Sequence, residues 1–167
     1  CPEQQRNIRA FLEIYEENFE GLGFDGVFLD KIRYGSFSNG LGGVFSCFCP
    51  ACRKRYREYG IDVDELKHQM GLVREGAGGY GEHVLGITAY DQGNYTFLHP
   101  VWEPFYRKKA EDIAGALKPV TRYFRQRGMK VGMDTFAPYL AYFAGQDMKL
   151  LASMADFIKP MMYRITN

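Results

Sequence analysis

The four cysteines form the pattern in this sequence that is best suited to binding chemistry. Cys47, Cys49 and Cys52 lie in the segment Cys-Phe-Cys-Pro-Ala-Cys, and Cys1 precedes Cys47 by 46 positions. The spacing predicts a loop that reverses as a helix begins near Pro50, where the amide dipoles favour anionic ligands. Four thiolates suit tetrahedral zinc and leave no open position on the metal. We therefore expect a structural Zn2+ bound by all four cysteines.

Two other interpretations of the cysteines remain open at this point. The residues could form one or two disulfides in a secreted protein, or Cys49 and Cys52 could act as a redox pair. The cysteines of the knuckle are poorly spaced for pairing with one another, and a third nearby thiol is unusual in a redox motif. A zinc site made of free thiols favours a cytoplasmic location.

Two carboxylates end predicted strands and are candidates for catalysis. Asp30 ends the apolar run 24–30, and Asp134 ends the run 130–134. Retaining glycosidases need one ionised and one protonated carboxyl on opposite sides of the sugar. We expect Asp30 to be the nucleophile and Asp134 to be a partner carboxylate or a hydroxyl-binding residue. Alternatively, Asp30 pairs with Arg33 and caps the loop, and Asp134 only organises the turn toward Pro138.

Four further residues near the strand ends are candidates for substrate binding. Arg33 and Tyr34 follow the first strand, and Lys159 and Tyr163 lie on the last one. A Tyr or Lys at a strand end can bind sugar hydroxyls or a carboxylate. The alternative for Lys159 is an ion pair with a neighbouring carboxylate of the protein.

Apolar periodicity predicts the elements that must position these residues. It indicates helices over 5–22, 50–59, 63–70, 103–127 and 139–154, and strands over 24–30, 130–134 and 157–163. Pro119 is expected to kink or divide its helix. Residues 35–43 are predicted to form a loop. Residues 71–100 lack clean periodicity and are predicted to form a long loop or an insertion.

The order of these elements indicates an α/β fold with parallel strands joined by right-handed crossovers. Polar groups recur where successive strands end, which favours a barrel over an open sheet, because barrel active sites gather on that face. We therefore expect residues 1–167 to form one partial (β/α)8-barrel domain of the catalytic type.

Several motifs, in order along the chain, resemble a group of hypothetical glycosyl hydrolase barrels. They are DGVFLDKIRY at 25–34 with the cysteine knuckle, GMDTFAP at 132–138, GQD at 145–147 and ADFIKPMMY at 155–163. The resemblance implies that the predicted strands are the fourth, fifth and sixth of eight in a TIM barrel. It also implies a hydrolase that cleaves O-glycosidic bonds of a carbohydrate.

The cysteine spacing is similar to that of the zinc-containing β-galactosidases of glycoside hydrolase family 42. In that family one ligand precedes the fourth strand and three follow it, and the resemblance places Asp30 near the family's acid/base. The chain departs from the family there, because it has Leu29-Asp30 where those enzymes carry Asn-Glu. An Asp ending this strand is instead similar to the nucleophile of α-fucosidase and α-galactosidase barrels.

Composition excludes several other classes of function. The chain has 21 basic and 20 acidic residues and a net charge of +1. It therefore lacks the excess of positive charge that is typical of proteins that bind nucleic acid or an anionic membrane. Phosphate-binding glycine loops and a Gly-x-Ser-x-Gly elbow are absent from the sequence. The three histidines, His68, His83 and His99, have no mutual metal spacing.

The expected partner is therefore a carbohydrate, and two alternatives to hydrolysis remain. One is a carbohydrate-binding or scaffold barrel without turnover, because this fold serves many chemistries. The other is an interaction module built on the cysteine cluster. The start at Cys1 and the end just after an apolar run lead us to expect cuts within a longer protein.

Overall fold

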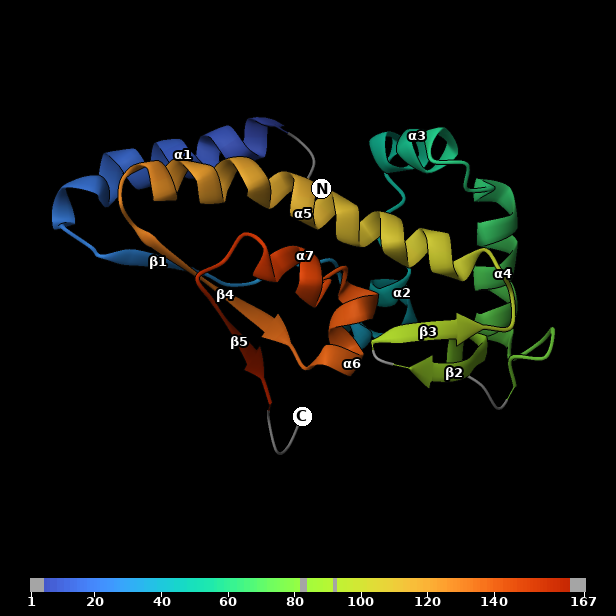
Figure 1. Ribbon diagram of the computed structural model, residues 1–167. Coiled ribbons are helices and arrows are strands. Elements are labelled where there is room, and N and C mark those ends of the chain that lie inside the picture. The colour runs from blue at the N-terminus through green and yellow to red at the C-terminus, as the bar shows by residue number, and fades with distance from the viewer. Residues whose placement is uncertain (1–4, 82–83, 92, 163–167) are drawn as a thin grey trace. The chain divides into compact units, whose positions relative to one another are not determined.

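The computed structural model describes residues 5–81, 84–91 and 93–162 (Figure 1). The chain forms two compact units. Unit 1 comprises Cys1–Arg33 and Ala110–Asn167, and unit 2 comprises Tyr34–Lys109. Three residues singled out in the sequence, Cys1, His83 and Tyr163, lie outside the described residues.

Unit 1 contains a three-stranded parallel sheet in the order β1-β4-β5. Its elements are α1 (Gln5–Asn18), η1 (Glu20–Leu22), β1 (Gly26–Leu29), β4 (Lys130–Phe136), α6 (Pro138–Ala141), η4 (Tyr142–Ala144), α7 (Met148–Ala152), β5 (Phe157–Met161) and the part of α5 (Trp102–Gln126) from Ala110 onward. The α/β class and the parallel strands predicted from the sequence are confirmed. No closed barrel forms among the described residues.

The register of the sheet places its aromatic side chains on one face. Phe28 of β1 and Phe157 of β5 both pair with Gly132 of β4. The two rings stack in front of this glycine, with centroids 5.8 Å apart and planes 10° apart. A Cβ on Gly132 would lie only 2.3 Å from the Phe157 ring and 2.6 Å from that of Phe28. Only glycine therefore allows these rings to meet.

The helix α1 packs along the later part of α5 within unit 1 (Figure 1). Tyr15 is the buried residue of α1; its ring lies 4.8 Å from that of Phe124, and its hydroxyl donates to the sulfur of Met129 at 3.2 Å. An open groove of about 560 Å³ runs between these helices and β1. It is lined largely by apolar side chains, among them Phe11, Phe19, Phe24, Val27, Leu117 and Val120.

Two predictions about helices in unit 1 are wrong in detail. The predicted helix over 139–154 is divided into α6, η4 and α7, because Gly145 adopts a left-handed conformation with φ 74° and ends the first part. Asp147 then caps α7 by accepting hydrogen bonds from the backbone N–H groups of Lys149 and Leu150. The helix α5, by contrast, continues through Pro119 without a break.

Unit 2 is mostly helical and carries a β-hairpin. Its elements are η2 (Phe37–Asn39), α2 (Gly40–Val44), α3 (Pro50–Glu58), α4 (Val63–Glu75), η3 (Val84–Gly86), β2 (Ile87–Asp91), β3 (Asn94–Phe97) and α5 up to Lys109. Asp62 caps α4, with its carboxylate accepting from the N–H groups of Asp64 and Glu65. The segment 71–100 is not a featureless loop, since α4 extends into it and β2 pairs with β3. No described helix combines the length and apolarity of a membrane span.

Candidate functional site

The three described cysteines gather in a cluster at the start of α3, in unit 2. The Sγ atoms of Cys47, Cys49 and Cys52 all lie within 4.8 Å of one another, and none of the three forms a disulfide. Cys49 is the N-cap of α3, Pro50 occupies its first turn, and Cys52 is fully buried. The backbone N–H of Cys49 donates to the Cys47 sulfur at 3.5 Å, which fixes the turn of the knuckle. The knuckle predicted from the spacing is therefore present.

The geometry and chemistry of this cluster suit a metal ion. Zn–S bonds of about 2.3 Å in a tetrahedron place the sulfurs about 3.8 Å apart, so an upper separation of 4.8 Å needs only small side-chain movements. Thiolates are soft ligands that select zinc and other soft or borderline metals. The predicted fourth ligand, Cys1, lies outside the described residues.

The thiols of the cluster differ in their protonation equilibria. A hydrogen bond from the backbone N–H of Cys52 lowers the pKa of the Cys49 thiol, and this effect outweighs burial, which would raise it. Burial raises the pKa of the Cys52 thiol, and the neighbouring thiols of Cys49 and Cys47 raise it further. The thiol of Cys49 therefore ionises more easily than the buried thiol of Cys52.

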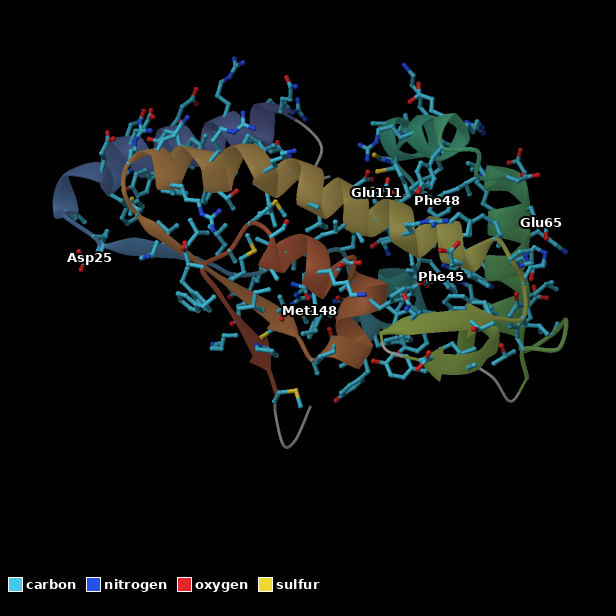
Figure 2. All side chains as sticks on the ribbon, viewed as in Figure 1. Asp25, Phe45, Phe48, Glu65, Glu111 and Met148 are labelled. Atoms are coloured by element: carbon cyan, nitrogen blue, oxygen red, sulfur yellow. The ribbon has the colours of Figure 1, made fainter. Side chains whose placement is uncertain are left out.

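Aromatic residues hold the knuckle in place. The hydroxyl of Tyr56, a fully buried residue of α3, donates to the Cys47 carbonyl oxygen at 3.0 Å. Phe48 lies between α3 and the first turns of α5, with its ring centroid 5.8 Å from Tyr56 and 6.1 Å from Phe105 (Figure 2). The cluster is thus attached to the packed core of unit 2.

Lys109 is a residue of this region that sequence reasoning missed. It is fully buried, and its ammonium donates to the Val44 carbonyl oxygen at 2.8 Å. Burial lowers the pKa of Lys109 to about 7, while the thiols of Cys47 and Cys52 act in the opposite direction. A signal existed in the sequence, because Lys109 lies midway between Phe105 and Ile113 on the apolar stripe of α5.

The carboxyl ends of the strands in unit 1 form a second polar region. The prediction that Asp134 ends its strand is wrong, because β4 pairs with β5 as far as Phe136. Leu29 pairs with Met133, so Asp30 and Asp134 each follow a residue of a pair. Neighbouring strands lie about 4.8 Å apart. Asp134 is buried, and its Oδ2 lies 3.2 Å from the ammonium of Lys159, the residue it pairs with in the ladder. The same ammonium lies 5.1 Å from the ring centroid of Phe28.

Two buried polar atoms near these strand ends have no hydrogen-bond partner among the described residues: Asp134 Oδ1 and Arg33 Nε. The guanidinium of Arg33 lies over the ring of Phe136, 4.3 Å from its centroid, and Phe136 is two residues beyond Asp134 on β4. Buried polar atoms without a partner cost about 1–3 kcal/mol each, so they usually have a reason.

Asp30 differs from Asp134 because it is exposed. Its Oδ1 accepts from the backbone N–H of Lys31 at 2.6 Å, and Lys31 has a positive φ of 55°. Among the described residues, Asp30 forms no ion pair with Arg33, so the pairing considered from the sequence is not formed. The hydrogen bond within its own turn holds this exposed carboxylate in place.

Gln146 connects β4 with the turn after β1 through hydrogen bonds of its side chain. It was not proposed as a site residue from the sequence. It is buried; its Oε1 accepts from the Phe136 N–H at 2.9 Å, and its Nε2 donates to the Asp134 carbonyl oxygen at 3.3 Å. The same Nε2 lies 3.5 Å from the Ile32 carbonyl oxygen, in the turn after β1. The Gly-Gln-Asp motif at 145–147 was the sequence signal for it.

The remaining predicted site residues are divided between the units. Arg33 and Lys159 lie in unit 1 with both carboxylates. Tyr34 belongs to unit 2, where it is buried and its ring centroid lies 5.0 Å from the Lys109 ammonium. Tyr163 lies outside the described residues.

Comparison with known proteins adds no family to these observations. The chain matches no protein-family model, no curated protein and no solved structure.

Proposed function

We propose that this chain is part of a glycoside hydrolase that cleaves O-glycosidic bonds of a carbohydrate at the carboxyl ends of β1, β4 and β5. The observation that carries the proposal is the pair of buried, unpartnered atoms, Asp134 Oδ1 and Arg33 Nε. One is an acceptor and the other a donor. A sugar hydroxyl both donates and accepts hydrogen bonds, so a carbohydrate suits this combination.

The barrel architecture that we propose has support in the packing of the sheet. Phe28 and Phe157 come from the two outer strands and meet in front of Gly132 of the middle strand. Side chains from alternate strands form such layers inside (β/α)8 barrels. The rings are 44% and 53% exposed here, as expected if further strands cover this face in a complete barrel.

The two carboxylates would have different roles. We assign Asp30 as the nucleophile, because its side chain is exposed and the hydrogen bond from the Lys31 N–H orients the carboxylate. The ion pair with Lys159 holds the Asp134 carboxylate in place, which suits it to binding a sugar hydroxyl. The general acid would then be a third carboxyl group.

The cysteine cluster would serve this enzyme as a structural zinc site. Cys47, Cys49 and Cys52 would supply three ligands and Cys1 the fourth. A zinc ion with four thiolates has no open position, so it would stabilise the knuckle after β1 and take no part in hydrolysis.

The experiment that tests the proposal is turnover of a panel of aryl glycosides by the intact protein and its variants. We expect Asp30→Asn to abolish cleavage and retain sugar binding, because an amide keeps the shape of the side chain but cannot attack the anomeric carbon. Asp134→Asn should mainly raise KM. The matched control is Asp25→Asn, at the amino end of the same strand (Figure 2). Full turnover by Asp30→Asn would overturn the catalytic assignment.

A non-catalytic carbohydrate-binding or scaffold barrel is the second candidate. The ion pair of Asp134 with Lys159 and the hydrogen bond of Asp30 within its own turn favour it, because both contacts also have a purely structural explanation. Sugar binding by the wild-type protein without turnover of any glycoside would select this candidate.

A further inference from the structure

Arg33, in the turn after β1, carries a positive charge that is not paired with any carboxylate of the described residues. Its side chain is half-buried, and its buried Nε has no hydrogen-bond partner in the part of the chain that the structure describes. Buried polar atoms in native proteins are almost always hydrogen-bonded, so a donor of this kind calls for a ligand or another explanation.

The guanidinium of Arg33 is held in a defined position. It lies over the ring of Phe136, 4.3 Å from the centroid. Gln146 fixes the chain on both sides of this contact, because it accepts from the Phe136 N–H at 2.9 Å and its Nε2 lies 3.5 Å from the carbonyl oxygen of Ile32. A guanidinium that lies over a ring keeps the N–H groups at its own edges available for hydrogen bonds.

This contact lies on the face of the sheet that also carries the buried carboxylate. Asp134 and Phe136 are two residues apart on β4, so their side chains point to the same face. Two residues of a parallel strand span about 6.6 Å. Lys159 pairs with Asp134 in the ladder and binds one of its oxygens, and the other oxygen, Oδ1, has no partner among the described residues. One sugar unit on this face could therefore contact both Arg33 and Asp134.

The charges of the region favour a ligand that is itself an anion. Segment 30–33 and positions 134 and 159 supply two carboxylates, Asp30 and Asp134, and three cations, Lys31, Arg33 and Lys159. One positive charge remains when all five side chains are ionised. A neutral sugar would leave this charge unbalanced, whereas a sugar carboxylate would neutralise it.

The shape of the guanidinium favours a carboxylate in particular. Its planar fork of N–H groups matches the two oxygens of a carboxylate and can bind both at once. A uronic acid differs from the corresponding neutral hexose by a carboxylate in place of the hydroxymethyl group. An acidic sugar would be repelled by an ionised Asp30 unless a cation offset that repulsion, and Arg33 supplies such a cation.

We propose that the substrate is a uronide, a glycoside of a uronic acid, and that Arg33 is the residue that selects it. The guanidinium binds the carboxylate of the sugar, and Asp134 Oδ1 accepts from a hydroxyl of the same sugar. The inference rests on the proposed function and goes beyond it by naming the class of substrate and the group that recognises it.

The first test compares substrates that differ only in this carboxylate. The 4-nitrophenyl glucuronides and glucosides form one matched set, and the galacturonides and galactosides form another, each in both anomeric forms. We expect the intact protein to have the higher kcat/KM for the uronide. Arg33→Met should lower this value about 10–100-fold, the effect of losing a hydrogen bond to a charged group. Arg33→Lys should have an intermediate effect, because it keeps the charge and loses the planar fork.

The control variant is Arg122→Met, which removes a positive charge from an exposed position of α5 in the same unit. It should keep the preference of the wild type for the uronide. An unchanged preference in Arg33→Met would assign selection to another cation and overturn the role of Arg33.

The outcomes for the wild type separate the two proposals. Absence of turnover for every glycoside of the panel would overturn the hydrolase and leave the ligand to be tested by binding. Faster turnover of neutral glycosides than of uronides would overturn only the class of substrate proposed here.

A binding measurement on the wild type depends neither on turnover nor on the folding of a variant. In protein with 15N-labelled arginine, the Nε–H resonance of Arg33 should shift when free D-glucuronate or D-galacturonate is added. Glucose, galactose and sodium acetate at the same concentration should shift it less. A response to neither uronate would overturn the inference, and a stronger response to glucose 6-sulfate would overturn the choice of a carboxylate.

Discussion

The cysteine knuckle of unit 2 and the strand-end carboxylates of unit 1 are assembled in opposite ways. The knuckle takes three ligands from the short segment 47–52, and one turn of chain brings their sulfurs within 4.8 Å. Asp30 and Asp134 are separated by more than half of the chain, and only the parallel pairing of β1 with β4 makes them neighbours. The first site is local in the sequence, whereas the second depends on the packing of unit 1.

The two regions also differ in how well they are packed: the knuckle contacts the core of unit 2, whereas the strand ends of unit 1 lie near half-exposed rings. The knuckle is enclosed by Tyr56, Phe48 and Phe105, so its ligands are held by the core of unit 2. The carboxylates lie beside Phe28 and Phe157, whose rings remain about half exposed. A substitution in the knuckle should therefore lower the stability of unit 2 as a whole. A substitution at the strand ends should have a more local effect on unit 1.

The largest effect should come from Cys52→Ser in the knuckle. Loss of this buried thiolate should abolish stoichiometric zinc binding and lower the stability of unit 2, because metal-binding free energy contributes directly to folding at structural sites. Elemental analysis and thermal melts with and without zinc measure both effects. Ala51→Ser, which adds a hydroxyl to the same segment and keeps every thiol, should behave like the wild type. An unchanged zinc content in Cys52→Ser would contradict the expectation.

An intermediate effect is expected from Gln146→Met at the strand ends. The substitution keeps the volume but leaves the Phe136 N–H and the Asp134 carbonyl without their partner, which should destabilise unit 1 by about 1–3 kcal/mol. The midpoint of urea unfolding measures this loss, and zinc binding by unit 2 should persist. Gln126→Met, at the exposed end of α5, is the matched control and should change the midpoint little. Equal midpoints for the two variants would show that Gln146 does not hold the strand ends.

The smallest effect should come from Asp156→Asn, before β5. The N–H of Val131 donates to the Asp156 carboxylate at 2.8 Å, and this bond, with Arg125 and Lys130 nearby, lowers the pKa of Asp156 below its ordinary value of 3.8. Its contribution to stability is therefore complete above about pH 3.8 and is lost as the pH falls through the lower folded pKa.

Thermal melts across this range should show Asp156→Asn slightly less stable than the wild type at pH 7, with the difference shrinking under acid conditions. Glu17→Gln, on the exposed side of α1, removes a charge from the same unit and should show no such trend. A difference that stays constant with pH would mean that the carboxylate charge is not what stabilises the start of β5.

Local chemistry explains why the sequence alone predicted several elements well. Asp62 and Asp147 cap helices through their own side chains, and Pro50 starts α3 without needing an N–H partner. The three strands are short apolar runs, which is typical of buried parallel strands. The cysteine cluster belongs to the same group, because its ligands are adjacent in the chain.

Other features depended on residues that are distant in the sequence. The hairpin of β2 and β3 was not predicted, because β2 is exposed apart from its half-buried first residue and β3 has only four residues. Lys109 lies on the apolar stripe of α5, but only the packing around Tyr34 and Val44 in unit 2 shows that its charged side chain is buried.

By itself, the sequence determined the α/β class, the cysteine knuckle and the candidate carboxylates, because these depend on residue type and short spacing. Only the tertiary structure decided that Asp134 pairs with Lys159, that Gln146 joins the turn after β1 to β4, and that Arg33 lies over Phe136. The physical reason is strand register. Contacts between residues far apart in the chain are fixed by which strands pair and at which residue, and no local pattern specifies that choice.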